Sequence, residues 1–231
     1  MADALVFMSG FALQGAIEPI VIPAFERDTG VRVDARWTPT TLAVKALNEG
    51  SEADVVVLAD PAIDDLCESG ILVPETRVAL ADATVGLAVL AGKPKPDIAT
   101  TEAFRQALLS CSAIAYSRAG ASGIYFEKLI DRLGIGEAVR QKAVVIPEGL
   151  TAEKLVSGEA DLAIQQISEL IMVKGVDLVG PLPPEVASVT GFSAAVLRSS
   201  PRQEQARQLV QALSSADAMK AYAAAGLSPR Q

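Results

Sequence analysis

The chain has 231 residues and half of them are hydrophobic, so it can bury a sizeable core and disorder is excluded. A formal net charge of −8, without any cluster of Lys and Arg, argues against binding to nucleic acids or acidic membranes. The chain contains no His, which excludes a His-based triad, a His metal site and an imidazole general base.

Hydropathy and the two cysteines exclude further classes of protein. No apolar segment approaches the roughly 20 residues that cross a bilayer, so we expect a protein that is not membrane-inserted. Cys67 and Cys111 are too far apart for a metal motif, and we interpret them as buried structural thiols in different lobes. We expect no cofactor and no metal.

Short apolar segments rich in β-branched residues alternate with helical patterns along the chain. Because alternating strands and helices form right-handed βαβ units, this order predicts an α/β fold with mostly parallel sheets. Val55–Leu58 lacks polar alternation, which is typical of a central strand covered by helices on both faces. The predicted strands are Leu5–Met8, Val31–Trp37, Asp54–Ala59, Ala113–Tyr116, Ala143–Ile146, Asp161–Ile164 and Val176–Val179.

Helical spacing is clearest over Ile17–Phe25, where Gly30 follows as a stop signal and Pro19 and Pro23 are expected to shorten or kink the helix. The other predicted helices are Thr40–Asn48, Pro61–Glu68, Thr101–Leu109, Ser122–Leu133, Thr151–Ser157, Pro201–Ser214 and Ala216–Ala225.

Two long apolar segments, Arg77–Gly92 and Ala187–Arg198, contain a Gly and show no helical pattern. We interpret them as paired strands that cross between two lobes. The first lobe would then be discontinuous, with residues 1–81 and 190–231, and the second lobe would comprise residues 82–189.

Small polar residues mark four predicted junctions between a strand and the helix after it. Ligands of open α/β sheets bind at such junctions, where the helix offers unpaired N–H groups. Each junction alone also fits an ordinary helix cap, but two junctions in each lobe predict a clamp that closes over a small anion. The junctions are Ser9–Phe11, Thr38–Thr41, Tyr116–Tyr125 and Pro147–Thr151.

Individual residues at these junctions have distinct expected roles. Hydroxyl groups can donate to an oxyanion, and glycines let the backbone approach it closely. Arg118 can offer a bidentate guanidinium, although a solvated surface arginine is an equally good interpretation. The candidate ligand-binding residues are Ser9, Gly10, Thr40, Thr41, Arg118, Ser122, Gly123, Glu148, Gly149 and Gln166.

Several motifs give the chain a resemblance to a known family. The chain resembles the molybdate-binding type 2 periplasmic solute receptors of ABC importers over nearly its whole length, which implies a two-lobed fold with hinge strands. The motifs that carry the resemblance are Thr41–Ala43, Leu47–Gly50, Ala53–Asp60, Ser122–Tyr125, Gly158–Ala163 and Ala225–Leu227.

The resemblance also implies residue roles. It assigns hydroxyl donors to Ser9 and Thr40, and backbone amide donors to Ser122 and Glu148. The family's Tyr is replaced here by Gln165 or Gln166. We expect Gln166 to take its role, and the longer reach of a Gln suggests a ligand of different shape.

Ile167–Leu170 and Gly180–Pro183 resemble a side branch of this family that is also similar to aconitate isomerase, an enzyme that interconverts cis and trans forms of a tricarboxylate. Two main hypotheses follow. The first is a monomeric receptor that binds an oxyanion such as molybdate, or a small carboxylate, and docks on an ABC permease. The second is an isomerase whose base is Glu148, Tyr116, Tyr125 or a Ser or Thr hydroxyl.

Cellular location follows from the same resemblance. A receptor of this kind is periplasmic, with its leader already removed, and the sequence opening at Met1 also allows a cytoplasmic protein. A cytoplasmic ligand-sensing module is the least favoured hypothesis, because the chain has no DNA-binding segment.

Overall fold

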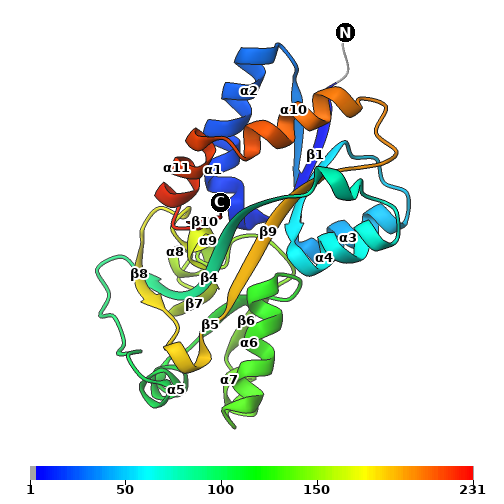
Figure 1. Cartoon of the computed structure of the whole chain (residues 1–231). Coiled ribbons are helices and arrows are strands. Elements are labelled where there is room, and N and C mark those ends of the chain that lie inside the picture. The colour runs from blue at the N-terminus through cyan, green and yellow to red at the C-terminus, as the bar shows by residue number, and fades with distance from the viewer. Residues whose placement is uncertain (1–3, 231) are drawn as a thin grey trace. The chain divides into compact units, whose positions relative to one another are not determined.

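The computed structural model describes residues 4–230 (Figure 1), so Met1, on which the expectation of a removed leader depends, lies outside the described residues. The chain forms two compact units. The first extends to Ala83 and resumes at Thr190, and the second is Thr84–Val189. Within residues 4–230, no helix has the length and apolar character needed to cross a bilayer.

The sheet of the first unit has the strand order β2-β1-β3-β9-β4, with β10 paired to β4. Strand β1 is parallel to β2 and β3, whereas β9 is antiparallel to β3. Val55–Leu58 is buried and lies in the interior strand β3, which confirms the predicted central strand. The strands are β1 (Leu5–Ser9), β2 (Val33–Trp37), β3 (Val55–Ala59), β4 (Val78–Leu90), β9 (Val189–Val196) and β10 (Ser228–Pro229).

Helices cover both faces of this sheet. Alternate residues of a strand point to opposite faces, and in β3 Val55 and Val57 belong to one apolar cluster while Val56 and Leu58 belong to another. The first cluster is covered by α2, α10 and α11, and the second by α3 and α4, which lie side by side in Figure 1. The helices are η1 (Phe11–Leu13), α1 (Gln14–Ala16), η2 (Ile17–Val21), α2 (Ile22–Thr29), α3 (Thr40–Asn48), α4 (Asp60–Glu68), η3 (Pro74–Thr76), α10 (Gln203–Leu213) and α11 (Ala216–Ala224).

The predicted helix over Ile17–Phe25 is interrupted. A π-helical turn, η2, contains Pro19, and the regular α2 follows it with Pro23 near its start. Pro cannot donate the helical hydrogen bond, so the widened turn accommodates Pro19. Gly30 ends α2 in the left-handed conformation with φ of 72°, as its position predicts.

The sheet of the second unit has the order β4-β7-β5-β6, with β8 also paired to β4. Strand β5 is parallel to β6 and β7, whereas β7 and β8 are antiparallel to β4. The carboxyl ends of β5, β6 and β7 therefore meet at one edge. The additional elements are α5 (Thr101–Ser110), β5 (Ile114–Ser117), α6 (Ala121–Arg132), α7 (Gly136–Arg140), β6 (Ala143–Ile146), α8 (Glu153–Val156), β7 (Leu162–Gln166), α9 (Ile167–Leu170), β8 (Val176–Pro181) and η4 (Pro184–Val186).

Two expectations from the sequence differ from this structure. Helices α7 and α9 were not predicted, because five and four residues are too few to show a helical period. The prediction that Cys67 and Cys111 are buried was wrong: both are free thiols that are only half-buried, because each packs at the edge of an apolar cluster.

Candidate functional site

In the first unit, Ser9 and Gly10 lie at the carboxyl end of β1. Ser9 is fully buried, and its hydroxyl donates a hydrogen bond to the Gly10 carbonyl at 3.0 Å. The N–H of Gly10 donates to the carbonyl of Val57 in β3. A Cβ placed at Gly10 would lie 3.8 Å from the Thr40 hydroxyl, so this junction and the next one come together in space.

Thr40 begins α3, whose cap residue Pro39 offers no side-chain acceptor. The first N–H groups of a helix have no acceptor inside the helix and carry its positive end. The Thr40 hydroxyl accepts a hydrogen bond from the N–H of Ala59 at 3.4 Å, which leaves its own proton available for a ligand. The side chain of Thr41 is exposed on the same turn.

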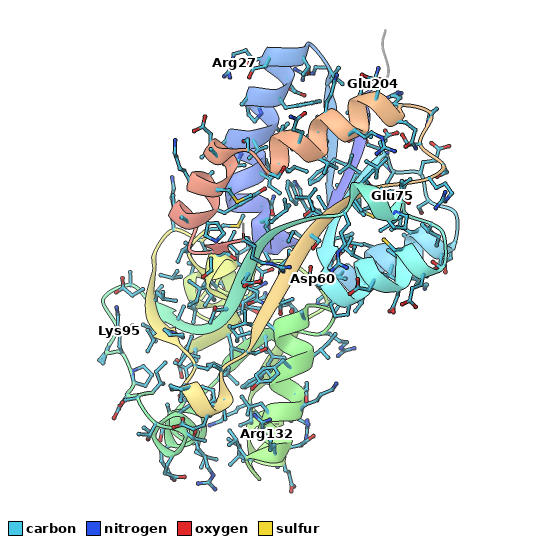
Figure 2. The ribbon with its side chains drawn as sticks, viewed as in Figure 1. Arg27, Asp60, Glu75, Lys95, Arg132 and Glu204 are labelled. Atoms are coloured by element: carbon cyan, nitrogen blue, oxygen red, sulfur yellow. The ribbon has the colours of Figure 1, made fainter. Side chains whose placement is uncertain are left out.

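A charged network that was not predicted lies beside these hydroxyls. Asp60 begins α4 and accepts hydrogen bonds from Ser193 at 2.6 Å and from Arg230 at 2.5 Å. Figure 2 labels Asp60 beside β9, which contains Ser193. Arg230 also donates to Asp82 at 3.2 Å. Asp60 follows a predicted strand and could have been found by the junction argument, whereas Arg230 has no local signal.

In the second unit, the first turn of α6 packs unusually close to the end of β5. A Cβ at Gly123 would lie 1.6 Å from the carbonyl oxygen of Ser117, so only Gly fits this position. The cap residue Gly120 provides no side-chain acceptor, so the N–H groups of Ala121 and Ser122 remain uncapped at the positive end of a twelve-residue helix. Ser122 itself is buried.

Arg118 lies between β5 and α6 and is exposed. Its backbone N–H donates to the Ile146 carbonyl at 2.8 Å, which fixes the start of its side chain beside the end of β6. Its guanidinium makes no ion pair within residues 4–230. It is therefore a cation whose donors are available at the edge where the second unit collects its candidate residues.

The loop after β6 contains Glu148 and Gly149. The side chain of Gln165, in β7, accepts from the Thr151 N–H at 2.7 Å and donates to the Gly149 carbonyl at 2.8 Å. Gln165 therefore holds this loop. Gln166 is engaged as well, in a reciprocal capping box with Glu169, so its role in place of the family's Tyr stays a prediction. Gln166 is buried at the start of α9.

Glu169 is a buried carboxyl group immediately behind Gln166. Its Oε2 accepts the Gln166 N–H at 3.2 Å. Burial raises the pKa of Glu169 to about 8, and the hydrogen bonds from Gln166 and Gln165 only partly oppose this shift. Near neutral pH, the carboxyl is therefore mostly protonated and the second unit avoids a buried negative charge at this edge.

The two candidate catalytic tyrosines are already hydrogen-bonded within the second unit. Tyr116 is buried and its hydroxyl donates to the Glu127 carboxylate, and burial together with that carboxylate raises the pKa of Tyr116. The hydroxyl of Tyr125 donates to the Val186 carbonyl at 2.9 Å. Neither hydroxyl can act as a base without first breaking these contacts.

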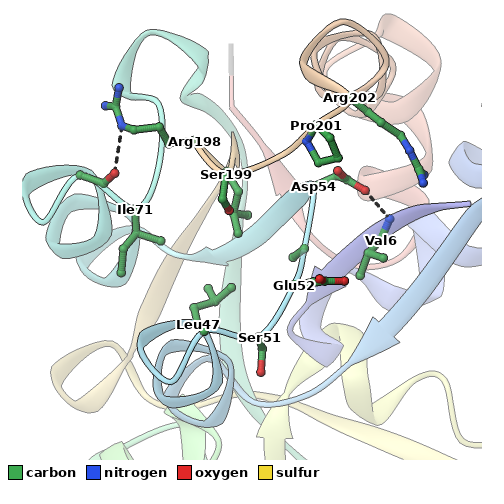
Figure 3. A pocket seen from close by; sticks show the side chains of 14 residues that line it. Val6, Leu47, Ser51, Glu52, Asp54, Ile71, Arg198, Ser199, Pro201 and Arg202 are labelled. Atoms are coloured by element: carbon green, nitrogen blue, oxygen red, sulfur yellow. Dashed lines mark hydrogen bonds between the residues drawn. The ribbon is translucent and has the colours of Figure 1, made fainter. Parts of the chain in front are cut away.

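The first unit also has a pocket of about 600 Å³, which lies at the opposite end of its sheet (Figure 3). Val6 and Asp54 line it at the amino ends of β1 and β3, whereas Ser9 and Thr40 lie beside the carboxyl ends. Asp54 accepts the Val6 N–H at 2.8 Å and a hydrogen bond from Ser200, so this carboxylate joins chain segments there. Within residues 4–230, no acidic and cysteine side chains cluster in a way that could hold a metal ion.

Comparison with known proteins agrees with the resemblance seen in the sequence. The family model for bacterial extracellular solute-binding proteins matches residues 5–228. An aconitate isomerase from a Pseudomonas species is 36% identical over 231 aligned residues, which cover 97% of this chain and 87% of the enzyme.

Two solved structures share the fold. The periplasmic molybdate-binding protein of Azotobacter vinelandii aligns with a TM-score of 0.81 and 19% identity over 98% of this chain and 100% of that chain. The sulfate-binding protein SubI of Mycobacterium tuberculosis aligns with a TM-score of 0.75 and 18% identity over 98% of this chain and 86% of that chain. These likenesses confirm the predicted two-lobed type 2 periplasmic-binding fold.

Proposed function

Because this chain belongs to the family of bacterial extracellular solute-binding proteins, we propose that it is an extracytoplasmic receptor that closes over a small anion and delivers it to an ABC permease. The observation that carries the proposal is a set of backbone N–H groups, at the carboxyl ends of strands, that find no acceptor within residues 4–230. They belong to the first turn of α6 and to the loop Glu148–Leu150. Such donors favour negative charge.

The first unit offers hydroxyl donors of its own. The Thr40 proton is available, and the Ser9 hydroxyl can turn from the Gly10 carbonyl toward a better acceptor. A charge-assisted hydrogen bond to an anion is stronger than the neutral bond it replaces. Ligand binding then shifts a pre-existing equilibrium toward the closed receptor without making or breaking a covalent bond.

The side chains favour a carboxylate over a tetrahedral oxyanion. Arg118 offers a planar guanidinium, which matches a carboxylate in bidentate geometry. The family resemblance implies that Gln166 takes the place of a Tyr, and a carboxamide can both donate and accept. The similarity to an aconitate isomerase points to the same class of ligand, namely an unsaturated di- or tricarboxylate.

A second candidate function, cis/trans isomerisation of such a polycarboxylate, is favoured by the 36% identity to that enzyme. A base would remove a proton from the methylene carbon next to the double bond, and the electron pair would form a dienolate. Rotation about the former double bond and return of the same proton would complete the reaction. Among the predicted bases, Glu148 is the exposed carboxylate, and Arg118 would stabilise the dienolate.

One experiment separates these functions. The purified protein is titrated calorimetrically with molybdate, sulfate, cis-aconitate and trans-aconitate, and its mixture with cis-aconitate is followed by proton NMR. We expect stoichiometric binding of an aconitate without turnover. Catalytic formation of the trans isomer would show that the protein is an isomerase and not a receptor. Failure to bind any of the four anions would overturn the anion-binding proposal itself.

A further inference from the structure

The side chain of Gln165 is buried and makes three hydrogen bonds to one loop. Its Oε1 accepts from the backbone N–H of Thr151 at 2.7 Å and from the Thr151 hydroxyl at 2.9 Å. Its Nε2 donates to the carbonyl of Gly149 at 2.8 Å. Thr151 is fully buried and its hydroxyl also reaches the Ile164 carbonyl, so this end of the loop is attached to β7.

These bonds set the direction of the neighbouring peptide groups. In a trans peptide, the carbonyl and the following N–H point in opposite directions, and the described chain contains no cis peptide. Because the Gly149 carbonyl points toward Gln165, the N–H of Leu150 points away from it. The same side chain therefore turns one carbonyl inward and one N–H outward.

The outward side of the loop carries donors that have no acceptor. The N–H groups of Glu148, Gly149 and Leu150 make no hydrogen bond within residues 4–230. Gly149 has a φ of +100°, in the left-handed region that favours glycine, and consecutive N–H groups converge around such a residue. A concave group of backbone donors of this kind binds a carboxylate or an oxyanion.

We propose that Gln165 is a positioning residue, which holds the Glu148–Leu150 loop so that its N–H groups face the bound anion, and that Leu150 contributes a backbone donor. This proposal rests on the proposed anion-binding function. It also explains the pair of glutamines in β7: Gln165 holds the loop, while its neighbour Gln166 points to the other face of the strand.

Preorganisation by a buried side chain has a measurable consequence. If the loop becomes ordered only when the ligand binds, the loss of conformational entropy lowers the affinity for the ligand. A loop that is already held in place does not carry this cost. Gln165→Met keeps the side-chain length but removes the three hydrogen bonds to the loop, together with the hydrogen bond to Glu169. We expect it to weaken binding of cis-aconitate, and of molybdate as a second probe, by about tenfold or more at every pH.

Gln165→Glu provides a conservative rescue. A protonated Glu can still donate to the Gly149 carbonyl and accept from Thr151, whereas an ionised Glu repels that carbonyl. We expect affinity close to wild type at about pH 5 and a loss of about tenfold or more at about pH 9. If Gln165 only stabilised the fold, the affinity of Gln165→Glu would not recover at about pH 5 while its folded fraction stayed constant.

Other carboxyl groups near this loop, those of Glu148, Glu153 and Glu169, require matched controls. Each affinity is therefore divided by that of the wild type at the same pH, and the series is repeated in a Glu169→Gln background. Gln141→Glu introduces the same charge at an exposed position of the second unit, and its profile should follow the wild type.

Amide hydrogen exchange tests the loop without a ligand. We expect the Thr151 N–H to be protected in the wild type and to exchange faster in Gln165→Met. If the wild type binds cis-aconitate and both Gln165 variants bind equally well at every pH, the positioning role is overturned. If the wild type binds neither probe, the proposed function fails, and unchanged exchange of Thr151 would then overturn the loop attachment separately.

Discussion

Arg230 donates a hydrogen bond to the carboxylate of Asp60 at 2.5 Å, across 170 positions of the sequence. The same Nη1 atom reaches Asp82 in β4, which is paired with Ser228 of the C-terminal strand β10. One side chain near the C-terminus therefore joins the start of α4 to strand β4. Its side chain is only 27% exposed and compensates the charge of both carboxylates, while Arg77 lies 3.9 Å from Asp60 as a second cation.

Replacing Arg230 by Gln should destabilise the protein by about 1–3 kcal/mol, because two partly buried carboxylates lose their shared cation. Urea unfolding checks this value. Arg207→Gln is the matched control, since Arg207 is exposed on α10 and makes no ion pair within residues 4–230. Equal unfolding midpoints for the two variants would show that the Asp60 network does not stabilise the first unit.

Glu169 should give the protein a pH-dependent stability. Burial raises the pKa of its carboxyl from 4.5 to about 8, so between these values the folded state keeps a proton that the unfolded state releases. The free energy of unfolding should therefore fall as pH rises through this window. Glu169→Gln should remove the decline and gain on the order of 2 kcal/mol at about pH 8.

Urea unfolding of the wild type and of Glu169→Gln from about pH 4 to pH 9 measures this difference. Glu204→Gln, at an exposed position of α10, is the control and should run parallel to the wild type. Parallel curves for the wild type and Glu169→Gln would mean that the Glu169 carboxyl is not held in its protonated form.

Gly123→Ala should be one of the most damaging small substitutions. Its Cβ would lie 1.6 Å from the Ser117 carbonyl oxygen, so α6 must move away from β5. We expect a loss of at least about 2 kcal/mol in unfolding free energy. At Gly10, an added Cβ meets atoms no closer than 3.7 Å, so Gly10→Ala should retain near-normal stability. Similar losses at both positions would contradict the close approach of α6.

Thr40→Val should weaken anion binding by about tenfold while it changes stability little, because the hydroxyl accepts from the Ala59 N–H and donates to no group within residues 4–230. Thr101→Val is a matched control, since Thr101 also begins a helix but lies at the start of α5. Calorimetric titration with the anion that binds the wild type measures the effect. An unchanged affinity in Thr40→Val would remove this hydroxyl from the site.

Arg118→Ala should separate the two classes of anion. A guanidinium binds a carboxylate through two parallel hydrogen bonds, so loss of Arg118 should weaken a polycarboxylate such as cis-aconitate by about tenfold to a hundredfold. Molybdate bound through backbone amides should lose less than about threefold. Lys128→Ala, an exposed cation on α6, controls for net charge. Equal losses for both anions would assign Arg118 a general electrostatic role.

Much of the fold and of the candidate site could be predicted from local patterns. Val55–Leu58 predicted a central strand because it lacks polar alternation, and Gly30 predicted the end of α2 because Gly favours the left-handed conformation at a helix end. Both signals are local in the sequence. Ser9 and Thr40 could be named from local sequence as well, since Ser9 ends β1, Thr40 begins the helix after β2, and parallel strands bring such junctions to one edge.

Other features depend on contacts between distant segments. From the sequence we expected Gln166 to replace the family's Tyr, but the contact of Gln165 with the Gly149 loop could not be predicted, because which of two adjacent strand residues faces that loop depends on the register of β7. Nor does any neighbouring residue indicate that Arg230 pairs with Asp60, or that Glu169 is buried enough to keep its proton. The sequence by itself determined the order of strands and helices and the donor types at their junctions, since these are local properties. Only the tertiary structure decided which of these groups have partners and which remain available, because hydrogen bonding and desolvation depend on residues far apart in the chain.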